Sequence, residues 1–286
     1  MEPAEVSRRL AATTSVAKEL GLSVEDTTVI QRANRLTVRL EPCDVLARVA
    51  ATVRRNQEIA AFEVDIARRL EQAGAPVAVL EPRVEPHVYL RDGFAITLWK
   101  YYEPLSDDEI PPADYAQALE RLHEAMRQLE VPAPHFTDRV DEAQSIVADP
   151  SRSPELADAD RELLADTLRT LRRAVVDRGT DEQLLHGEPH PGNLLSTESG
   201  PRFIDFETCC HGPIEFDIAH APDEVGDHYA GADQLQVRDC RILSMAMVAS
   251  WRADRDDIFP NGRQMRDELL AEVRDALDHY GIEISH

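Results

Sequence analysis

Residues 184–195, LLHGEPHPGNLL, place a carboxylate and an amide in one turn-rich stretch between leucine pairs. A second stretch, RFIDFETCCHGPIEFDIAHA at 202–221, carries Asp205 within a short apolar run and Asp217 downstream. Phosphoryl transfer from a nucleotide needs a carboxylate that accepts the proton of the attacking hydroxyl, and two further oxygen ligands that hold Mg²⁺ against the phosphates. One loop and one hairpin could supply all three groups.

The first stretch permits two other interpretations. His186 and His190, four residues apart, would bind a metal together with Glu188 if the segment were helical, as in zinc enzymes. Two prolines within the segment argue against a helix, because proline removes a backbone donor and clashes with the preceding turn. A solvent-exposed loop without chemistry is the other alternative, and the matching segment around Asp205 argues against it.

Three short patterns in this region resemble those of the aminoglycoside phosphotransferase and choline kinase superfamily, a small-molecule branch of the protein-kinase-like fold. Its members carry H-G-D-x-x-x-x-N, then I-D-[FW]-[EG], then D-[IL]-A. The matching residues, in the same order, are His186, Gly187, Glu188, Asn193, Ile204, Asp205, Phe206, Glu207, Asp217, Ile218 and Ala219. The resemblance covers most of the chain and is most specific in residues 184–221.

The resemblance implies a role for each of the matched polar residues. Asn193 and Asp205 resemble the Mg²⁺ ligands of the family, and Glu188 occupies the place of the catalytic base. His186 is expected to support the loop without taking part in chemistry. Asp217 is expected to hydrogen-bond the catalytic loop from the start of a helix.

Glu188 stands where the family has aspartate. The additional methylene changes the reach of the carboxylate, and a misplacement of about 1 Å can cost on the order of 10²-fold in rate. Glutamate and aspartate have similar unperturbed proton affinities, so we expect Glu188 to work as the base. Glu207 is open between two interpretations, a residue that supports the metal ligands and a solvated side chain.

The nucleotide phosphates need a cation from the first hundred residues. The two lysines of the chain, Lys18 and Lys100, fall in the first helix and at the expected hinge. Arg48, in VLARVA, is therefore expected to bind the phosphates, as arginine does in choline-kinase-like relatives. Its acidic partner is expected on the following helix, at Glu63 with Glu58 in reserve.

Two further segments are expected to contact the nucleotide. The phosphate-covering loop is expected at QRANRL, residues 31–36, where Asn34 matches the family and the usual glycines are missing. Glycine lets backbone amides approach phosphates closely, so this loop departs from the family pattern. Leu98, Trp99 and Lys100 are expected at the hinge, where Trp99 would line an adenine pocket.

The elements that must position these residues change in character near residue 102. Residues 1–102 are expected to form a β-rich nucleotide-binding lobe, and 103–286 a mainly helical catalytic and substrate-binding lobe. Helices are expected at 4–20, 56–73, 115–129, 158–176 and 265–280, and strands at 27–31, 36–40, 45–50, 84–90 and 94–102. The expected class is α+β, a bilobal protein-kinase-like fold.

Composition limits the partners. The formal charge is −23 and no basic stripe interleaved with aromatic residues occurs, which argues against nucleic acid. No apolar leader or run of roughly 20 apolar residues is present, so we expect a cytoplasmic protein without a membrane partner. Residues 181–286 hold 22 acidic residues against 8 arginines, a net charge of −14 that permits a cationic ligand.

These observations predict an Mg²⁺-dependent enzyme that transfers the γ-phosphate of ATP or GTP to a hydroxyl of a cationic small molecule. An aminoglycoside or peptide antibiotic is the first acceptor class, which would make the protein a resistance enzyme. A choline-, ethanolamine- or sugar-type metabolite kinase is the first alternative, and a nucleotide-binding pseudokinase is the second. A monomer or a homodimer is expected.

Overall fold

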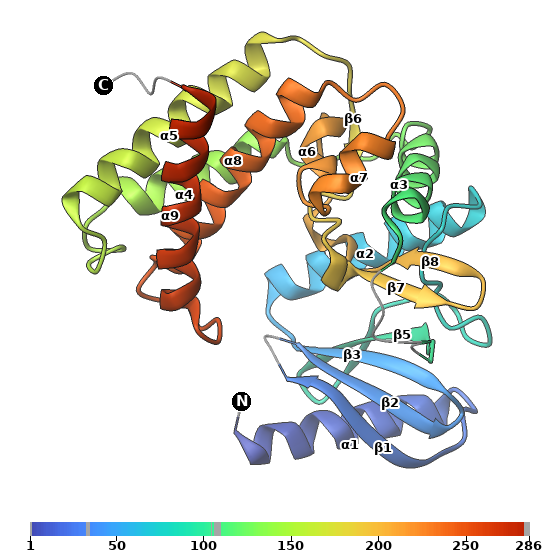
Figure 1. Cartoon of the computed structure of the whole chain (residues 1–286). Coiled ribbons are helices and arrows are strands. Elements are labelled where there is room, and N and C mark those ends of the chain that lie inside the picture. The colour runs from blue at the N-terminus through green and yellow to red at the C-terminus, as the bar shows by residue number, and fades with distance from the viewer. Residues whose placement is uncertain (1, 33–34, 104, 106–109, 283–286) are drawn as a thin grey trace. The chain divides into compact units, whose positions relative to one another are not determined.

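The computed structural model describes residues 2–32, 35–103, 105 and 110–282. By compactness the chain divides into unit 1, residues 1–129 with 192–208, and unit 2, residues 130–191 with 209–286. The β-rich N-terminal sheet and the mainly helical C-terminal part confirm the expected fold class (Figure 1). This division by compactness does not test the lobe boundary expected at residue 102, which stays a prediction.

Unit 1 contains a five-stranded antiparallel sheet with the strand order β1-β2-β3-β5-β4, and a separate hairpin of β7 and β8. Its strands are β1 (Val24–Arg32), β2 (Leu36–Pro42), β3 (Val45–Ala51), β4 (Tyr89–Arg91), β5 (Phe94–Lys100), β7 (Leu194–Thr197) and β8 (Gly200–Phe203). Its helices are α1 (Pro3–Glu19), α2 (Arg54–Gln72), α3 (Pro112–Met126) and the 3-10 turn η2 (Phe206–Thr208).

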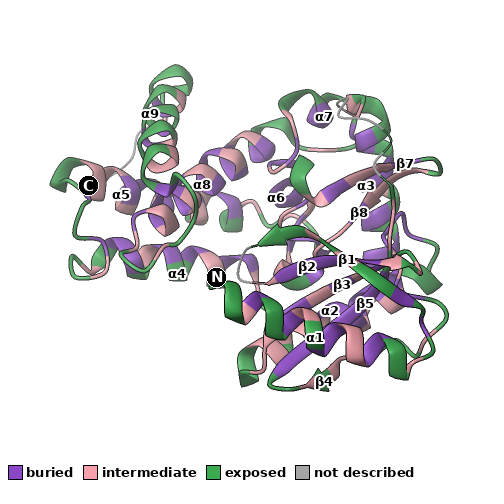
Figure 2. Cartoon of the chain, turned by 90° about the horizontal axis from the view of Figure 1, so that it is seen from below, coloured by how far each residue is buried: buried purple, intermediate pink, exposed green. Residues whose placement is uncertain are grey.

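The two faces of the large sheet carry different helices, with α1 on one face and α2 on the other (Figure 2). Alternation along β3 explains the division, because successive side chains of a strand point to opposite faces. Val45, Ala47 and Val49 are buried in the core beneath α1. Arg48, between them, points to the face of α2, where it pairs with Glu63. The sheet therefore turns an apolar face to α1, and Arg48 lies on the face of α2.

The strand expected at residues 84–90 is largely wrong. The structure forms only the three-residue β4 from this segment, and residues 84–88 lie outside any strand. Pro86 supplies the reason, since proline cannot donate to a strand ladder. The free edge of β5 is instead bonded to residues 79–81, where Glu81 N–H donates to Leu98 O at 3.0 Å.

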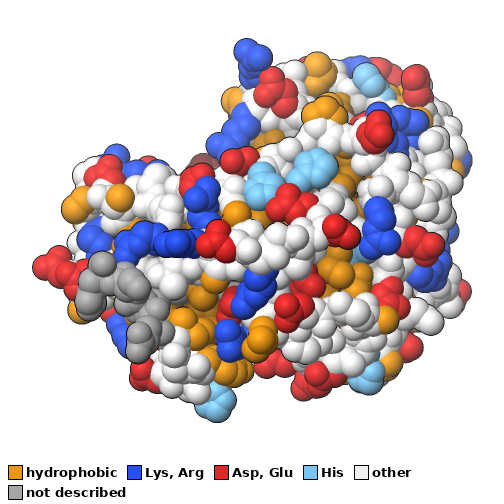
Figure 3. Space-filling model, turned by 90° about the horizontal axis from the view of Figure 1, so that it is seen from above, with side chains coloured by type: hydrophobic (Ala, Val, Ile, Leu, Met, Phe, Trp, Pro, Cys, Tyr) orange, Lys and Arg blue, Asp and Glu red, His pale blue; other side chains and the backbone are white. Residues whose placement is uncertain are grey.

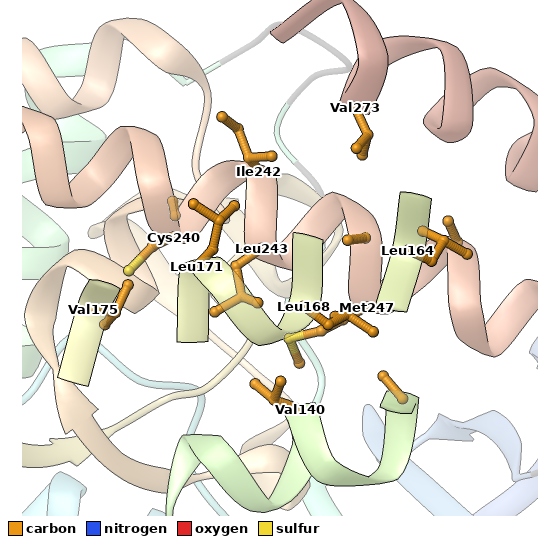
Figure 4. Close-up of a cluster of buried hydrophobic side chains, with 14 of the residues drawn as sticks. Val140, Leu164, Leu168, Leu171, Val175, Cys240, Ile242, Leu243, Met247 and Val273 are labelled. Carbon is orange, nitrogen blue, oxygen red and sulfur yellow. The ribbon is translucent and has the colours of Figure 1, made fainter. Parts of the chain in front are cut away.

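Unit 2 is mainly helical around one hydrophobic core, part of which is shown in Figure 4. That core includes Val140 of α4, Leu168 and Leu171 of α5, and Leu243 of α8. The elements are α4 (Phe136–Ala148), α5 (Asp158–Asp177), β6 (Glu182–Leu185), β9 (Cys210–Pro213), α6 (Ile214–Ile218), α7 (Asp223–His228), α8 (Gln234–Arg252) and α9 (Gly262–Tyr280). The 3-10 turn η1 (Pro191–Asn193) joins the loop of unit 2 to β7.

Helix α4 was not among the helices expected from the sequence, although prolines lie close to both of its ends. These prolines flank the helix and do not interrupt it. His135 caps the helix, because its ring accepts from the Thr137 N–H while the Asp138 carboxylate accepts from the His135 N–H at 2.9 Å. A histidine at this position is not among the preferred caps, so the start of the helix had no familiar signal.

Candidate functional site

Arg48 lies at the centre of an ion-pair cluster in unit 1. Its guanidinium pairs with Glu63 on α2 and donates through Nη2 to Asp205 Oδ2 at 3.0 Å. Glu63 is fully buried, and the Arg48 side chain is 14% exposed. Burial alone lowers the pKa of Arg48, but the nearby carboxylates of Glu63 and Asp205 raise it, so the guanidinium stays charged. Glu63, the first of the two acids nominated from the sequence, is therefore the partner on the helix.

Asn193 and Asp205 lie at the same open end of the β7–β8 hairpin. The register pairs Leu194 with Phe203, and the Ile204 N–H donates to Asn193 O at 3.0 Å. Asp205 follows immediately and has a φ of 70°, an unusual conformation for a residue other than glycine. The hairpin thus brings together the two residues that the sequence proposed as metal ligands.

The residues at this end fit a magnesium ion. Asp205 Oδ1 is buried and has no hydrogen-bond partner among the described residues, whereas Oδ2 accepts from Arg48. A buried carboxylate oxygen without a partner is costly unless something else binds it. Carboxylate and amide oxygens are hard ligands of the kind that Mg²⁺ takes, usually with waters and phosphates. No cluster of three His, Cys, Asp or Glu suited to a metal occurs in the described ranges, so a site held wholly by such side chains is not seen there.

The expected hinge residues are built into the sheet. Leu98 and Trp99 are buried, while Lys100, the last residue of β5, is exposed. Leu98 O accepts from Glu81 N–H and Lys100 N–H donates to Val79 O, each at 3.0 Å. These two backbone groups are therefore already engaged within the sheet. The Trp99 ring lies 5.9 Å from the Arg48 guanidinium, and its Nε1 donates to Thr97.

Arg35, which the sequence analysis did not single out, joins the same cluster. Its Nη1 donates to Glu63 Oε2 at 2.8 Å, and it forms an ion pair with Glu207. Glu207 therefore has a cationic partner, and its role beside the metal ligands stays a prediction. Asn34, next to Arg35 in the expected phosphate loop, lies outside the described residues.

In unit 2 the loop that carries Glu188 is fixed by Asp217 of α6. The two carboxylate oxygens of Asp217 accept from the backbone N–H groups of His186 and Gly187, both at 2.8 Å. His186 and Asp217 are fully buried. The Glu188 N–H donates to His186 Nδ1 at 3.4 Å, so the ring supports the loop from within. These are the contacts that the sequence analysis expected of Asp217 and His186.

Arg139 on α4 is a further residue of this region that sequence reasoning missed. Its guanidinium forms an ion pair with the Glu188 carboxylate and donates through Nη1 to Gly187 O at 3.0 Å. The same group lies 5.1 Å from the Trp251 ring, which packs against it. Arg139 precedes Glu188 by 49 residues on a helix that was not expected, so no local pattern could have indicated the pair.

The surroundings of Glu188 lower its pKa. Burial is the largest single influence and raises the pKa, but the charge and hydrogen bond of Arg139 and the charges of His220 and His190 together outweigh it. Glu188 is therefore ionised at neutral pH and able to accept a proton or a hydrogen bond, at reduced basicity.

The profile of the phosphotransferase enzyme family (APH) matches residues 29–238, about three quarters of the chain. The chain therefore belongs to the phosphotransferase enzyme family. Among curated protein sequences, none matches the chain significantly. No helix in the described part of the chain is long and apolar enough to cross a membrane.

Solved structures of kinases share the fold. The amicoumacin kinase hAmiN, in complex with AMP-PNP, Ca²⁺ and Ami, is 15% identical with a TM-score of 0.70, and the match covers 96% of each chain. The choline kinase LicA from Streptococcus pneumoniae is 15% identical with a TM-score of 0.66, covering 92% of this chain and 99% of that one. APH(2")-IIia, in complex with GDP and kanamycin, is 15% identical with a TM-score of 0.65, covering 94% and 99%.

Proposed function

We propose that this protein transfers the γ-phosphate of ATP or GTP, with Mg²⁺, to a hydroxyl group of a cationic small molecule. An aminoglycoside or a peptide antibiotic is the acceptor class that we place first. The observation that carries the proposal is the Arg48 cluster, which ties β3, α2 and the Asp205 segment together through Glu63 and Asp205. An arginine held in this way presents a charge that suits the phosphates of a nucleotide.

The metal would be held by Asn193 and Asp205. When bound, Mg²⁺ neutralises charge on the phosphate oxygens. Arg48 contributes a further positive charge beside Asp205. The purine would contact the chain beyond Lys100, because the backbone groups of Leu98 and Lys100 that face residues 79–81 are already bonded.

Glu188 is the proposed base. The acceptor oxygen forms a bond to the γ-phosphorus, the bond from that phosphorus to the β–γ bridging oxygen breaks, and the hydroxyl proton passes to the Glu188 carboxylate. Arg139 supports this role, because it keeps the carboxylate ionised and holds it to the backbone of the loop. Proton acceptance of this kind contributes typically 10²–10⁴-fold in rate.

A cationic acceptor is supported by a cavity in unit 2 of about 1010 Å³. Four carboxylates and two guanidinium groups line it, together with apolar side chains of α8 and α9. Ser244 in its wall lies 3.5 Å from His220 Nε2, and His220 is near enough to Glu188 to lower the pKa of that carboxyl. An acidic and partly apolar cavity favours an amphiphilic cation.

A screen of nucleotide consumption tests the proposal. Purified protein with Mg²⁺ and ATP or GTP is offered aminoglycosides, cyclic peptide antibiotics, choline, ethanolamine and amino sugars, and phosphorylated product is identified by mass spectrometry. Asp205→Asn is the matched inactive control, because it removes the charged metal ligand while keeping the size of the side chain. Folding of the variant is checked by thermal melting.

The outcomes separate three functions. Phosphorylation of an antibiotic supports the first proposal, and phosphorylation of choline, ethanolamine or a sugar supports a metabolite kinase instead. Nucleotide binding without transfer to any acceptor supports a pseudokinase. Two features motivate this alternative: glutamate at position 188, where the family has aspartate, and the absence of glycine from residues 31–36. Equal activity in a folded Asp205→Asn variant contradicts the metal assignment. We also propose a cytoplasmic location and a monomer or a homodimer.

A further inference from the structure

A second cavity lies within unit 1, between the sheet and the first half of α2, with a volume of about 630 Å³. Arg48 is paired with Thr97, and Ala50 with Ala95, across β3 and β5, so these four side chains share one face. Alanine at positions 50 and 95 leaves space between the sheet and the helix. The remaining lining residues are Arg35, Arg55, Asn56, Ile59, Ala60, Glu207 and Thr208.

Three arginines from three different segments line this cavity in a chain whose formal charge is −23. Arg48 and Arg35 are held by carboxylates: Arg48 by Glu63 and Asp205, and Arg35 by Glu63 and Glu207. The side chain of Arg55 makes no ion pair or hydrogen bond with any residue in the described ranges. Arg55 is exposed, and no carboxylate in the described ranges pairs with it.

Arg55 also lies at the positive end of the α2 helix dipole. Arg55 is the second residue of α2, a helix of 19 residues with no acidic residue in its first turn and no side-chain cap at its N-terminus. The first N–H groups of such a helix have no partner within the helix, and the helix dipole is positive at this end. Arg54, the neighbouring residue, differs, because its side chain is 92% exposed and pairs with Glu58 at 2.8 Å.

We propose that this arginine cavity binds the terminal phosphates of the nucleotide donor, with Arg55 as an additional phosphate ligand. The inference rests on the nucleotide-dependent function proposed above and extends it to a residue that the sequence did not nominate. Arg48 lines the cavity and also donates to Asp205, so the cavity adjoins the proposed metal ligand. Side-chain donors would thereby take the place of the backbone amides that a glycine-containing loop brings close to the phosphates. Segment 31–36 contains no glycine.

Calorimetric titration with sodium tripolyphosphate and with Mg²⁺–AMP-PNP tests the inference on the full chain. Arg55→Gln should weaken tripolyphosphate binding on the order of 10-fold, because a charge-assisted hydrogen bond is lost. Arg54→Gln is the matched control and should bind as the parent does, since it removes an equal charge one residue away. Arg55→Lys should recover part of the loss. Thermal melting checks that each variant is folded.

Two results would overturn the inference: the parent fails to bind tripolyphosphate, or Arg55→Gln and Arg54→Gln bind it equally. If only the total positive charge mattered, both variants would lose the same affinity for tripolyphosphate. The proposed enzyme activity is judged separately by the acceptor screen. If the parent binds tripolyphosphate through Arg55 but phosphorylates no acceptor, the cavity stands and the proposed function fails.

Discussion

Glu188 shows how one substitution in a family motif changes the demands on its surroundings. A glutamate side chain is longer than an aspartate side chain, so it has more conformations to lose when its carboxylate is fixed in one position. Arg139 restricts it by binding the carboxylate and the neighbouring Gly187 O at once. The ion pair also lowers the pKa of Glu188 against the effect of burial. The residue thus gains a fixed position and loses some basicity.

We predict that Glu188→Gln keeps nucleotide binding and loses most phosphoryl transfer, by 10²-fold or more, since an amide cannot accept the proton. Glu188→Asp should be partly active, because the shorter side chain keeps the carboxylate but reaches Arg139 less well. Turnover with the acceptor found in the screen, and titration with AMP-PNP, measure the two effects separately. Transfer by Glu188→Gln at the parent rate would show that the residue is not the base.

Removal of Arg139 should change the pH dependence of the reaction. In Arg139→Gln the burial that raises the pKa of Glu188 is no longer opposed by the arginine, although His220 and His190 remain nearby. The pKa of Glu188 then rises, and a base must be deprotonated to act, so the acid limb of the kcat profile should move to higher pH. Arg139→Lys keeps the charge and should move it less. A variant that loses activity equally at every pH would indicate a purely structural role.

Residues of the site differ in how far the sequence could reveal them. Glu188, Asn193, Asp205 and Asp217 belong to short local patterns whose spacing follows from one loop and one hairpin. Arg139 is brought to Glu188 by tertiary packing across 49 residues, and Arg55 is one of 31 basic residues with no pattern of its own. Contacts of this kind depend on the folded arrangement.

At the scale of elements, Arg48 joins parts of unit 1 that are distant in the chain. It lies on β3, its partner Glu63 lies on α2, and Asp205 follows the β7–β8 hairpin 157 residues after it. Glu63 has no exposed surface, so Arg48 and Arg35 take the place of water in compensating its negative charge. A buried carboxylate that loses its partner is strongly destabilising.

We therefore predict two consequences of Arg48→Ala. The nucleotide dissociation constant should rise at least several-fold, because contacts of this kind contribute roughly 1.5–3 kcal/mol each. The free energy of unfolding should also fall, by up to about 3–5 kcal/mol if Arg35 cannot compensate Glu63. Arg48→Lys keeps one positive charge and should lose less of both. Calorimetry and chemical denaturation measure them, and unchanged nucleotide affinity in a folded Arg48→Ala would contradict the phosphate-binding role.

Elements with a clear periodicity of apolar residues and a common residue at their ends were predicted well from the sequence. The helix expected at 265–280 is α9, which ends at Gly281 with a φ of 60°, as a glycine C-cap requires. The strands around Arg48 and the helix that carries Glu63 also lie where they were expected. Helix α4 was missed because prolines lie close to both of its ends. The strand at 84–90 was overextended because Pro86 removes a ladder donor within the segment.

At the scale of the whole molecule, the net charge is strongly negative, but acidic and basic side chains are mixed locally. Figure 3 shows acidic and basic side chains interspersed over the face that it presents, without a continuous basic stripe. A net charge of −23 repels a nucleotide at long range and attracts a cation. Under the proposed function, the arginines beside Asp205 are a local exception that would bind the phosphates, and a cationic acceptor would be attracted by the overall negative charge.

The field predicts opposite salt effects for the two substrates. Raising the ionic strength from about 0.01 M to about 0.15 M shortens the screening length from about 30 Å to about 8 Å, so long-range attraction is largely lost. For a polycationic acceptor kcat/KM should fall over this range, whereas for the Mg²⁺–nucleotide it should stay constant or rise, because repulsion is screened. A neutral sugar offered as acceptor is the control and should show little change. If kcat/KM for a polycation is independent of salt while the enzyme phosphorylates it, recognition depends on short-range contacts in the acidic cavity, and the net charge serves solubility alone.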